Sequence, residues 1–101
     1  MNMLLNDEFI PAVKAGTKRS TVRKGVRSIE LGAMCRLQGE HDYADVSING
    51  TTFKLFDELD SADAIRDGFE SVDELRRVLT DIYGPLEGEP VTIIRFTVLP
   101  S

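Results

Sequence analysis

The sequence predicts a small α+β fold, in which a mostly antiparallel curved sheet or barrel is covered by helices. The chain has 101 residues, 42% of them hydrophobic, which fits one domain with a single core. Several short segments rich in β-branched residues alternate with turn signals, as expected for strands. Only residues 61–83 are long enough to cross over between parallel strands, so we expect most neighbouring strands to be antiparallel.

Three segments show helical signals, and in chain order they are 7–15, 61–67 and 72–83. In the first, Pro11 fits the first turn and Gly16 supplies a left-handed C-terminal residue. Gly68 ends the second helix, and the third opens with a capping box formed by Ser71 and Glu74.

The strand signals fall on segments 19–23, 34–38, 44–48, 51–56 and 91–99. Asn49-Gly50 lies between the third and fourth of these segments and predicts a tight hairpin turn there. The last segment, VTIIRFTVL, is almost continuously apolar, which is typical of a central strand buried on both faces.

Charge is unevenly distributed along the chain. The formal net charge is −5, with +1 in residues 1–50 and −6 in residues 51–101. Residues 9–29 contain no acidic side chain and six basic ones, at positions 14, 18, 19, 23, 24 and 27. Such a run predicts either a solvated basic face or a patch that contacts phosphate, for which Lys14, Lys24 and Arg27 are the candidates.

The sequence also excludes several classes of protein. No apolar run approaches the roughly 18 residues that a membrane-spanning helix needs, and the first residues, MNMLLNDEF, lack the basic start of a signal peptide. The single cysteine, Cys35, has no disulfide partner, and with one histidine, His41, it leaves too few ligands for structural zinc. We therefore expect a cytoplasmic protein without a cofactor or structural zinc. A Mg²⁺ or Ca²⁺ site made only of carboxylates stays open as an alternative, although no segment has the EF-hand spacing.

The segment GTKRSTVRKG (16–25) contains the residues best suited to chemistry. On a strand that begins at Arg19, residues 19, 21 and 23 share one face, and Lys18 lies on the loop that enters it. A threonine hydroxyl such as that of Thr21 is a poor nucleophile unless a base is close. A lysine serves as that base when burial or neighbouring cations, here Arg19 and Arg23, lower its pKa. Taken alone, these residue types are more typical of an ordinary strand surface than of a catalytic site.

The order of these motifs resembles the ASCH domain family. The chain carries G-x-K-x-x-T-x-R after the first helix, a glycine before a strand (Leu31-Gly32-Ala33), D-G-F-E-S-V-x-E-L at 67–75 and a terminal apolar strand. The resemblance covers nearly the whole chain and implies one ASCH domain over residues 1–101 with a PUA-like β-barrel. It also implies a cleft that accepts RNA or nucleosides.

One branch of that family consists of small amidohydrolases that convert N4-acetylcytidine into cytidine and acetate. Carried onto this chain, the resemblance places the base at Lys18, the nucleophile at Thr21 and the acid at Asp67. The acid position holds aspartate where the family has glutamate, and Glu70 is the alternative acid. The candidates for holding the substrate are Arg19, Arg23, Phe69 and Tyr83.

Two other functions fit the same resemblance. A PUA-like module would bind RNA through the basic run and accept an extruded base in the cleft. A ribonuclease would use Lys18 and Arg23 beside a 2′-hydroxyl. A modified nucleoside and RNA are thus the two candidate partners.

Overall fold

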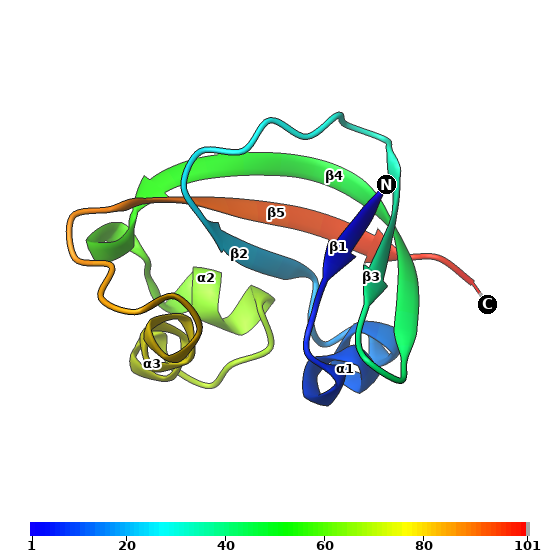
Figure 1. Ribbon diagram of the computed structural model, residues 1–101, viewed down its shortest axis with the longest axis horizontal. Helices are drawn as coiled ribbons and strands as arrows, with labels where there is room; N and C mark the ends of the chain where they lie inside the picture. Colours follow the sequence, from blue (N-terminus) through cyan, green and yellow to red (C-terminus); the bar gives the residue numbers. More distant parts are fainter. Residues whose placement is uncertain (101) are drawn as a thin grey trace.

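The computed structural model describes residues 1–100 and contains one five-stranded sheet with helices packed against it (Figure 1). The strands are β1 (Asn2–Leu4), β2 (Ser20–Lys24), β3 (Met34–Gln38), β4 (Tyr43–Leu55) and β5 (Pro90–Val98). The helices are α1 (Ile10–Ala15), α2 (Ser61–Arg66) and α3 (Val72–Tyr83), with 3₁₀ turns at Asp7–Phe9 and Phe56–Glu58. Only β1 and β3 pair in parallel, so the predicted α+β class and mostly antiparallel sheet are confirmed.

Strand pairing does not close this sheet into the predicted barrel. The strand order is β1-β3-β4-β5-β2, which leaves β1 and β2 as its two edges. β1 has only three residues, all paired with β3, and no strand is predicted there from the sequence. The two edges are instead joined by a side chain, because the Arg23 guanidinium Nη2 on β2 donates to the Leu4 carbonyl at 2.6 Å.

The predicted hairpin at Asn49-Gly50 is wrong. β4 runs without a turn from Tyr43 to Leu55, and both of its halves pair with β5. The register shifts between Ile48 and Gly50, so the dipeptide forms a β-bulge. Asn49 Nδ2 donates to Thr97 Oγ1 at 2.7 Å, and a Cβ at Gly50 would lie 2.6 Å from the Arg95 guanidinium. The nine-residue partner strand β5 is long enough to hold both halves of β4 extended.

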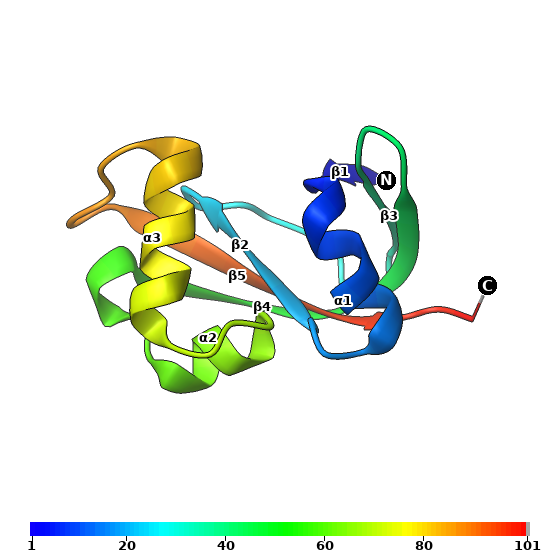
Figure 2. The same cartoon turned by 90° about the horizontal axis from the view of Figure 1, so that it is seen from below.

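β5 is the central strand that its apolar sequence predicts. Alternate residues of a strand point to opposite faces. Val91 and Ile93 pack with the side chains of α2 and α3, whereas Ile94 and Phe96 pack with those of α1, β3 and β4. Figure 2 shows α1 near one end of the sheet and the pair α2–α3 near the other. The molecule therefore has two apolar clusters with β5 between them.

The helix ends follow the local signals in the sequence. Gly16 ends α1 with a φ of 81°, and the Ser71 hydroxyl accepts from the Glu74 N–H at the start of α3. The Asp60 carboxylate caps α2 by accepting from the Asp63 N–H at 3.0 Å. No helix within residues 1–100 has the length and apolar character that crossing a membrane requires.

We expect Gly39→Ala to lower the free energy of unfolding by about 1–2 kcal/mol. Gly39 lies in the β3–β4 turn, where an added Cβ would displace the carboxylate of Asp7. That carboxylate accepts from the backbone N–H groups of His41 at 3.0 Å and Asp42 at 3.2 Å, which ties the first 3₁₀ turn to the sheet. Urea denaturation measures the loss. In an Asp7→Ala background the same substitution should cost little, and an equal cost in both backgrounds would contradict this explanation.

Candidate functional site

A cavity of about 160 Å³ lies between the two edges of the sheet and α3. β1 and the residue after it contribute Leu4 and Leu5, and β2 contributes Thr21, Val22 and Arg23. The remaining lining residues are Asn6, Phe9, Lys18, Asp67, Phe69, Leu75, Val78, Leu79, Ile82 and Tyr83. The open seam of the sheet thus forms a pocket with an apolar wall and a few polar groups. Such pockets are the usual sites for small ligands.

Lys18 and Asp67 form a buried ion pair in this cavity, although 49 positions separate them in the chain. Each residue is 4% exposed. Lys18 Nζ donates to the Asp67 carboxylate and, at 3.4 Å, to the Asp67 carbonyl oxygen. The ammonium therefore binds Asp67 and forms no hydrogen bond to Thr21 in this structure.

Two glycine-containing turns bring the pair together. After Gly16 the chain leaves α1, and the Lys18 N–H donates to the Ala12 carbonyl at 3.0 Å. Asp67 is the C-cap of α2, and Gly68 follows it with a φ of 90°. A Cβ at Gly68 would touch Lys18 Cβ at 3.4 Å, so the turn after α2 packs directly against the lysine.

Burial shifts the pKa of each group in the direction that favours its neutral form. It lowers the pKa of Lys18 from its usual 10.5, and the nearby Asp67 carboxylate only partly opposes that change. It raises the pKa of Asp67 to about 6, against the opposing effects of Lys18 and Arg23. A buried ion pair stabilises a fold poorly, because the loss of hydration offsets its Coulomb attraction. Perturbed groups of this kind in a cleft indicate a functional site.

Thr21 and Arg23 reach the same cavity from β2. Thr21 is 4% exposed and pairs with Ile94 of β5, so its backbone is held by the sheet. Arg23 Nη2 binds the Leu4 carbonyl, while its buried Nε has no hydrogen-bond partner among residues 1–100. A buried N–H donor without a partner beside a cavity is available to a ligand.

Aromatic rings form the wall around the Lys18 ammonium. The rings of Phe9 and Phe69 meet edge to face, with centroids 5.9 Å apart and planes at 76°. Lys18 Nζ lies 5.7 Å from the first ring centroid and 5.9 Å from the second. These contacts keep the cation in an apolar, water-poor environment, where its charge is costly.

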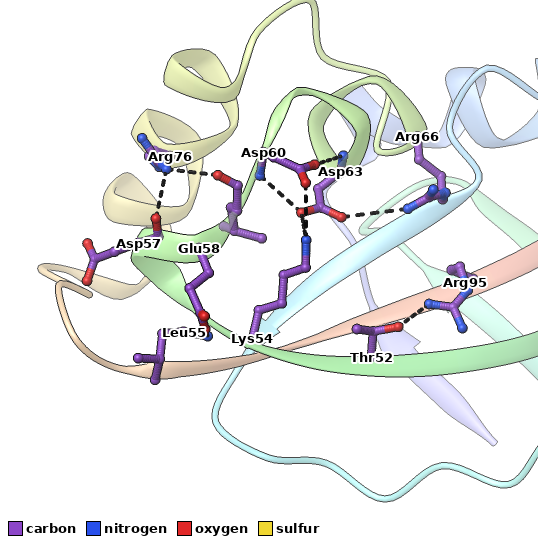
Figure 3. A network of polar contacts seen from close by, with 11 residues as sticks. Thr52, Lys54, Leu55, Asp57, Glu58, Asp60, Asp63, Arg66, Arg76 and Arg95 are labelled. Atoms are coloured by element: carbon purple, nitrogen blue, oxygen red, sulfur yellow. Dashed lines mark hydrogen bonds and ion pairs between the residues drawn. The ribbon is translucent and has the colours of Figure 1, made fainter.

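A second polar network fixes α2, the helix that ends at Asp67 (Figure 3). Lys54 of β4 donates to the carboxylate of Asp63 at 2.6 Å, and burial leaves that aspartate 4% exposed. Lys54 also lies 3.4 Å from the Asp60 carboxylate. The Arg66 guanidinium lies 3.7 Å from the Asp63 carboxylate and completes the network. The position of Asp67 is thus set by contacts between α2 and the sheet.

The remaining predicted site residues do not reach the cavity. Arg19 and Glu70 are exposed and line none of it. Lys14 pairs with Asp42 at 2.7 Å, near the C-terminal end of β5, whereas Lys24 pairs in register with Val91 at the other end. Val91 and Val98 are about 23 Å apart at 3.3 Å per residue. Exposed Lys24 and Arg27 are therefore well separated from Lys14, and the basic run does not form one patch.

Several lining residues were not predicted as part of a site. Phe9 of the first 3₁₀ turn and Val78 and Ile82 of α3 line the cavity with apolar side chains. Leu4 and Leu5 carried no functional signal. Apolar residues that line a pocket show the same sequence periodicity as residues of the core. Only the folded arrangement of the elements shows which of them face the cavity.

The described residues contain no group of three or more His, Cys, Asp or Glu side chains placed to hold a metal ion. Cys35 is buried, which raises the pKa of its thiol. The polar groups that line the cavity include the Lys18 amine, the Asp67 carboxyl group, the Thr21 hydroxyl and the Arg23 guanidinium.

Comparison with solved structures identifies the fold. The ASCH domain from Lactobacillus crispatus superposes with a TM-score of 0.81 at 11% identity, over 91% of this chain and 70% of its own. Hypothetical protein PH0355 superposes with a TM-score of 0.75 at 20% identity, over 97% of each chain. ASCH from Zymomonas mobilis gives 0.69 at 15% identity, over 96% of this chain and 68% of its own. No protein-family model and no curated protein sequence matches the chain. The chain thus has the fold of ASCH domains.

Proposed function

We propose that this chain, with its ASCH-domain fold, belongs to the ASCH family and hydrolyses the N-acyl amide of N4-acetylcytidine-type nucleosides. The observation that carries the proposal is the buried Lys18–Asp67 pair, which lines the same cavity as Thr21. An amide hydrolase needs a nucleophile, a base to activate it and an acid for the leaving nitrogen. The cavity holds one group suited to each role.

The pair reacts as its neutral tautomer. Moving one proton from Lys18 to Asp67 gives a free amine and a carboxylic acid without changing the number of protons on the pair. Burial disfavours the charged forms of both groups and so brings this tautomer closer in energy to the ion pair. The neutral amine is then the base, and the carboxylic acid is the proton donor.

In the first half-reaction, Thr21 Oγ attacks the acyl carbon and its proton passes to the Lys18 amine. The bond from the acyl carbon to N4 breaks, and N4 takes the proton of Asp67 as cytidine leaves. The unpaired Arg23 Nε is the donor for the negative charge that develops on the acyl oxygen. An acetyl-Thr21 ester and a Lys18–Asp67 ion pair remain.

In the second half-reaction, water attacks the ester carbon and gives its proton to the Asp67 carboxylate. The Thr21 oxygen leaves with the proton held by Lys18, and acetic acid is released. Both groups then have their starting protonation. One substrate molecule and one water molecule give one cytidine and one acetic acid.

The wall of the cavity suits a flat, uncharged base. Phe69 and Tyr83 line it and provide ring surface for the pyrimidine. A neighbouring groove shares Leu4, Leu5 and Asn6 with the cavity and carries acidic residues, among them Asp7, Glu8 and Glu40. Negative charge there repels phosphate, which favours a free nucleoside over RNA.

The pH dependence of hydrolysis should report the Lys18–Asp67 pair. The reactive pair holds one proton, so a second proton, taken up below the Asp67 pKa of about 6, inactivates it. We expect kcat/KM to fall about tenfold per pH unit below that value. On the alkaline side, kcat/KM should fall only when the pair loses its one remaining proton, a step governed by the lowered pKa of Lys18. A Lys24→Met control should keep the profile, and a rate that stays constant from pH 7 to pH 4 would contradict the assignment.

Substrate choice is tested by incubating the purified chain with N4-acetylcytidine and, separately, with a short RNA. Chromatography should show release of cytidine and acetate and an intact RNA strand. Salt-sensitive RNA binding without turnover would instead assign the chain to RNA recognition, and that binding should then depend on Lys24 and Arg27. Strand cleavage would assign it to the ribonucleases.

A further inference from the structure

The strand β2 has a free edge, and that edge borders the cavity. In an antiparallel pair, every second residue directs both its N–H and its C=O to the partner strand. The Arg19 carbonyl accepts from the Phe96 N–H at 3.0 Å, and the Gly25 N–H donates to the Pro90 carbonyl at 2.8 Å. Odd-numbered residues of β2 therefore bond to β5, and the backbone groups of Ser20, Val22 and Lys24 point away from it.

Among these three residues, Val22 is the one that lines the cavity. It is 4% exposed, and the chain opposite it is the end of β1 at Leu4 and Leu5. That end is engaged elsewhere, because the Leu4 carbonyl accepts from Arg23 and the Leu5 N–H donates to Gln38. Within residues 1–100, β2 pairs with β5 alone, and the Val22 N–H and C=O form no backbone hydrogen bond across the other edge. Buried backbone groups are nearly always paired, so these two need a partner from outside the chain.

We propose that the Val22 N–H and C=O bind the Watson–Crick edge of an N4-acylated cytosine, a step that rests on the function proposed above. The N–H donates to N3 of the base, and the C=O accepts from the adjacent N4–H. A donor and an acceptor on one extended residue face the same way, as do N3 and N4–H of the pyrimidine. The base thus adds to the edge of β2 in the place that a further strand would occupy.

This pairing selects the base and positions its acyl group. A uracil ring carries an N3–H donor and an O4 acceptor, which is the reverse pattern, so both of its groups would face like groups of Val22. N4 also carries the acyl group, and in this pairing N4 lies at the carbonyl end of Val22, the end that leads to Arg23. Binding the N4–H at Val22 therefore holds the acyl group near Arg23, whose unpaired Nε is the donor proposed above for the acyl oxygen.

The test removes one partner of the proposed N–H to N3 bond from each side. On the substrate side, N4-acetyl-3-deazacytidine has a C–H in place of N3, and its kcat/KM should be about 10- to 100-fold below that of N4-acetylcytidine. On the protein side, a full-length chain with an ester in place of the Val22 amide lacks the N–H. Ligation of a synthetic segment 1–34 to the segment that begins at Cys35 gives this chain, and the all-amide ligated chain is its control.

In the ester chain the preference for N4-acetylcytidine over its 3-deaza analogue should nearly vanish. Equal rates for the two substrates in the all-amide chain would overturn the proposal, and so would an unchanged preference in the ester chain. If neither substrate is hydrolysed, the proposed function fails, and edge binding is then measured by the ¹⁵N–¹H shift of Val22. A shift on adding cytidine but not 3-deazacytidine would support the pairing, and no difference between them would overturn it.

Discussion

Thr21→Val should lower the rate of N4-acetylcytidine hydrolysis by about a thousandfold or more and leave the fold intact. Valine keeps the β-branched shape that suits β2 and removes only the hydroxyl. Thr21 is 4% exposed and pairs with Ile94 in the sheet, so the backbone is held without that hydroxyl. Thr21→Ser keeps a nucleophile and should retain measurable turnover.

Ser20→Ala is the matched control for that loss. The Ser20 hydroxyl is also buried in β2 and has no hydrogen-bond partner within residues 1–100, but it does not line the cavity. Hydrolysis by Ser20→Ala should equal that of the unchanged chain. Turnover by Thr21→Val within a few-fold of the unchanged chain would remove Thr21 from the mechanism.

Lys18→Met should lower the free energy of unfolding by about 3–5 kcal/mol at pH 7. The substitution leaves the Asp67 carboxylate buried at 4% exposure without its cation. The folded-state pKa of Asp67 is already raised to about 6, above the value of about 3.9 in an unfolded chain, and loss of the lysine raises it further. The folded variant therefore takes up this proton at a higher pH than the unchanged chain does, so the penalty should shrink as the pH falls from 7 to about 6 and stay nearly constant below that value.

Replacing both partners distinguishes a functional pair from a structural one. Lys18→Met combined with Asp67→Leu buries no charge, so we expect stability at or above that of the unchanged chain and no hydrolysis. The exposed pair Lys14–Asp42 supplies the control, and Lys14→Met should unfold at nearly the same urea concentration as the unchanged chain. A double variant less stable than Lys18→Met alone would show that the pair is kept for the fold.

Local signals in the sequence predicted the helices and most strands well. The predicted helix 72–83 and strand 34–38 have the bounds of α3 and β3, and 61–67 differs from α2 by one residue. Each carries its own information in the form of caps, alternation or a glycine stop. The Asn49-Gly50 hairpin failed because a distant strand, β5, decides whether that dipeptide turns or bulges. The prediction of a closed barrel also failed because of long-range pairing, since closure depends on how far β1 extends.

The residues of the site were harder to predict from local sequence signals. The resemblance to ASCH domains, and not the spacing of residues, singled out Lys18, Thr21 and Asp67 together, and the structure lines one cavity with all three. The six basic residues of 9–29 are close in sequence, yet Lys18 and Arg23 line the cavity while Lys14 and Lys24 lie near opposite ends of β5. Burial of the Lys18–Asp67 pair follows from the packing of α2 against the sheet, which composition does not reveal.

Mass spectrometry of the acyl-enzyme tests the central claim most directly. The chain is mixed with N4-acetylcytidine, quenched in acid within the first turnover and digested. The mechanism predicts a mass increase of about 42 Da on Thr21, because its oxygen carries the acetyl group between the two half-reactions. Cytidine release with Thr21 unmodified, or with the acetyl group on Lys18 instead, would contradict it.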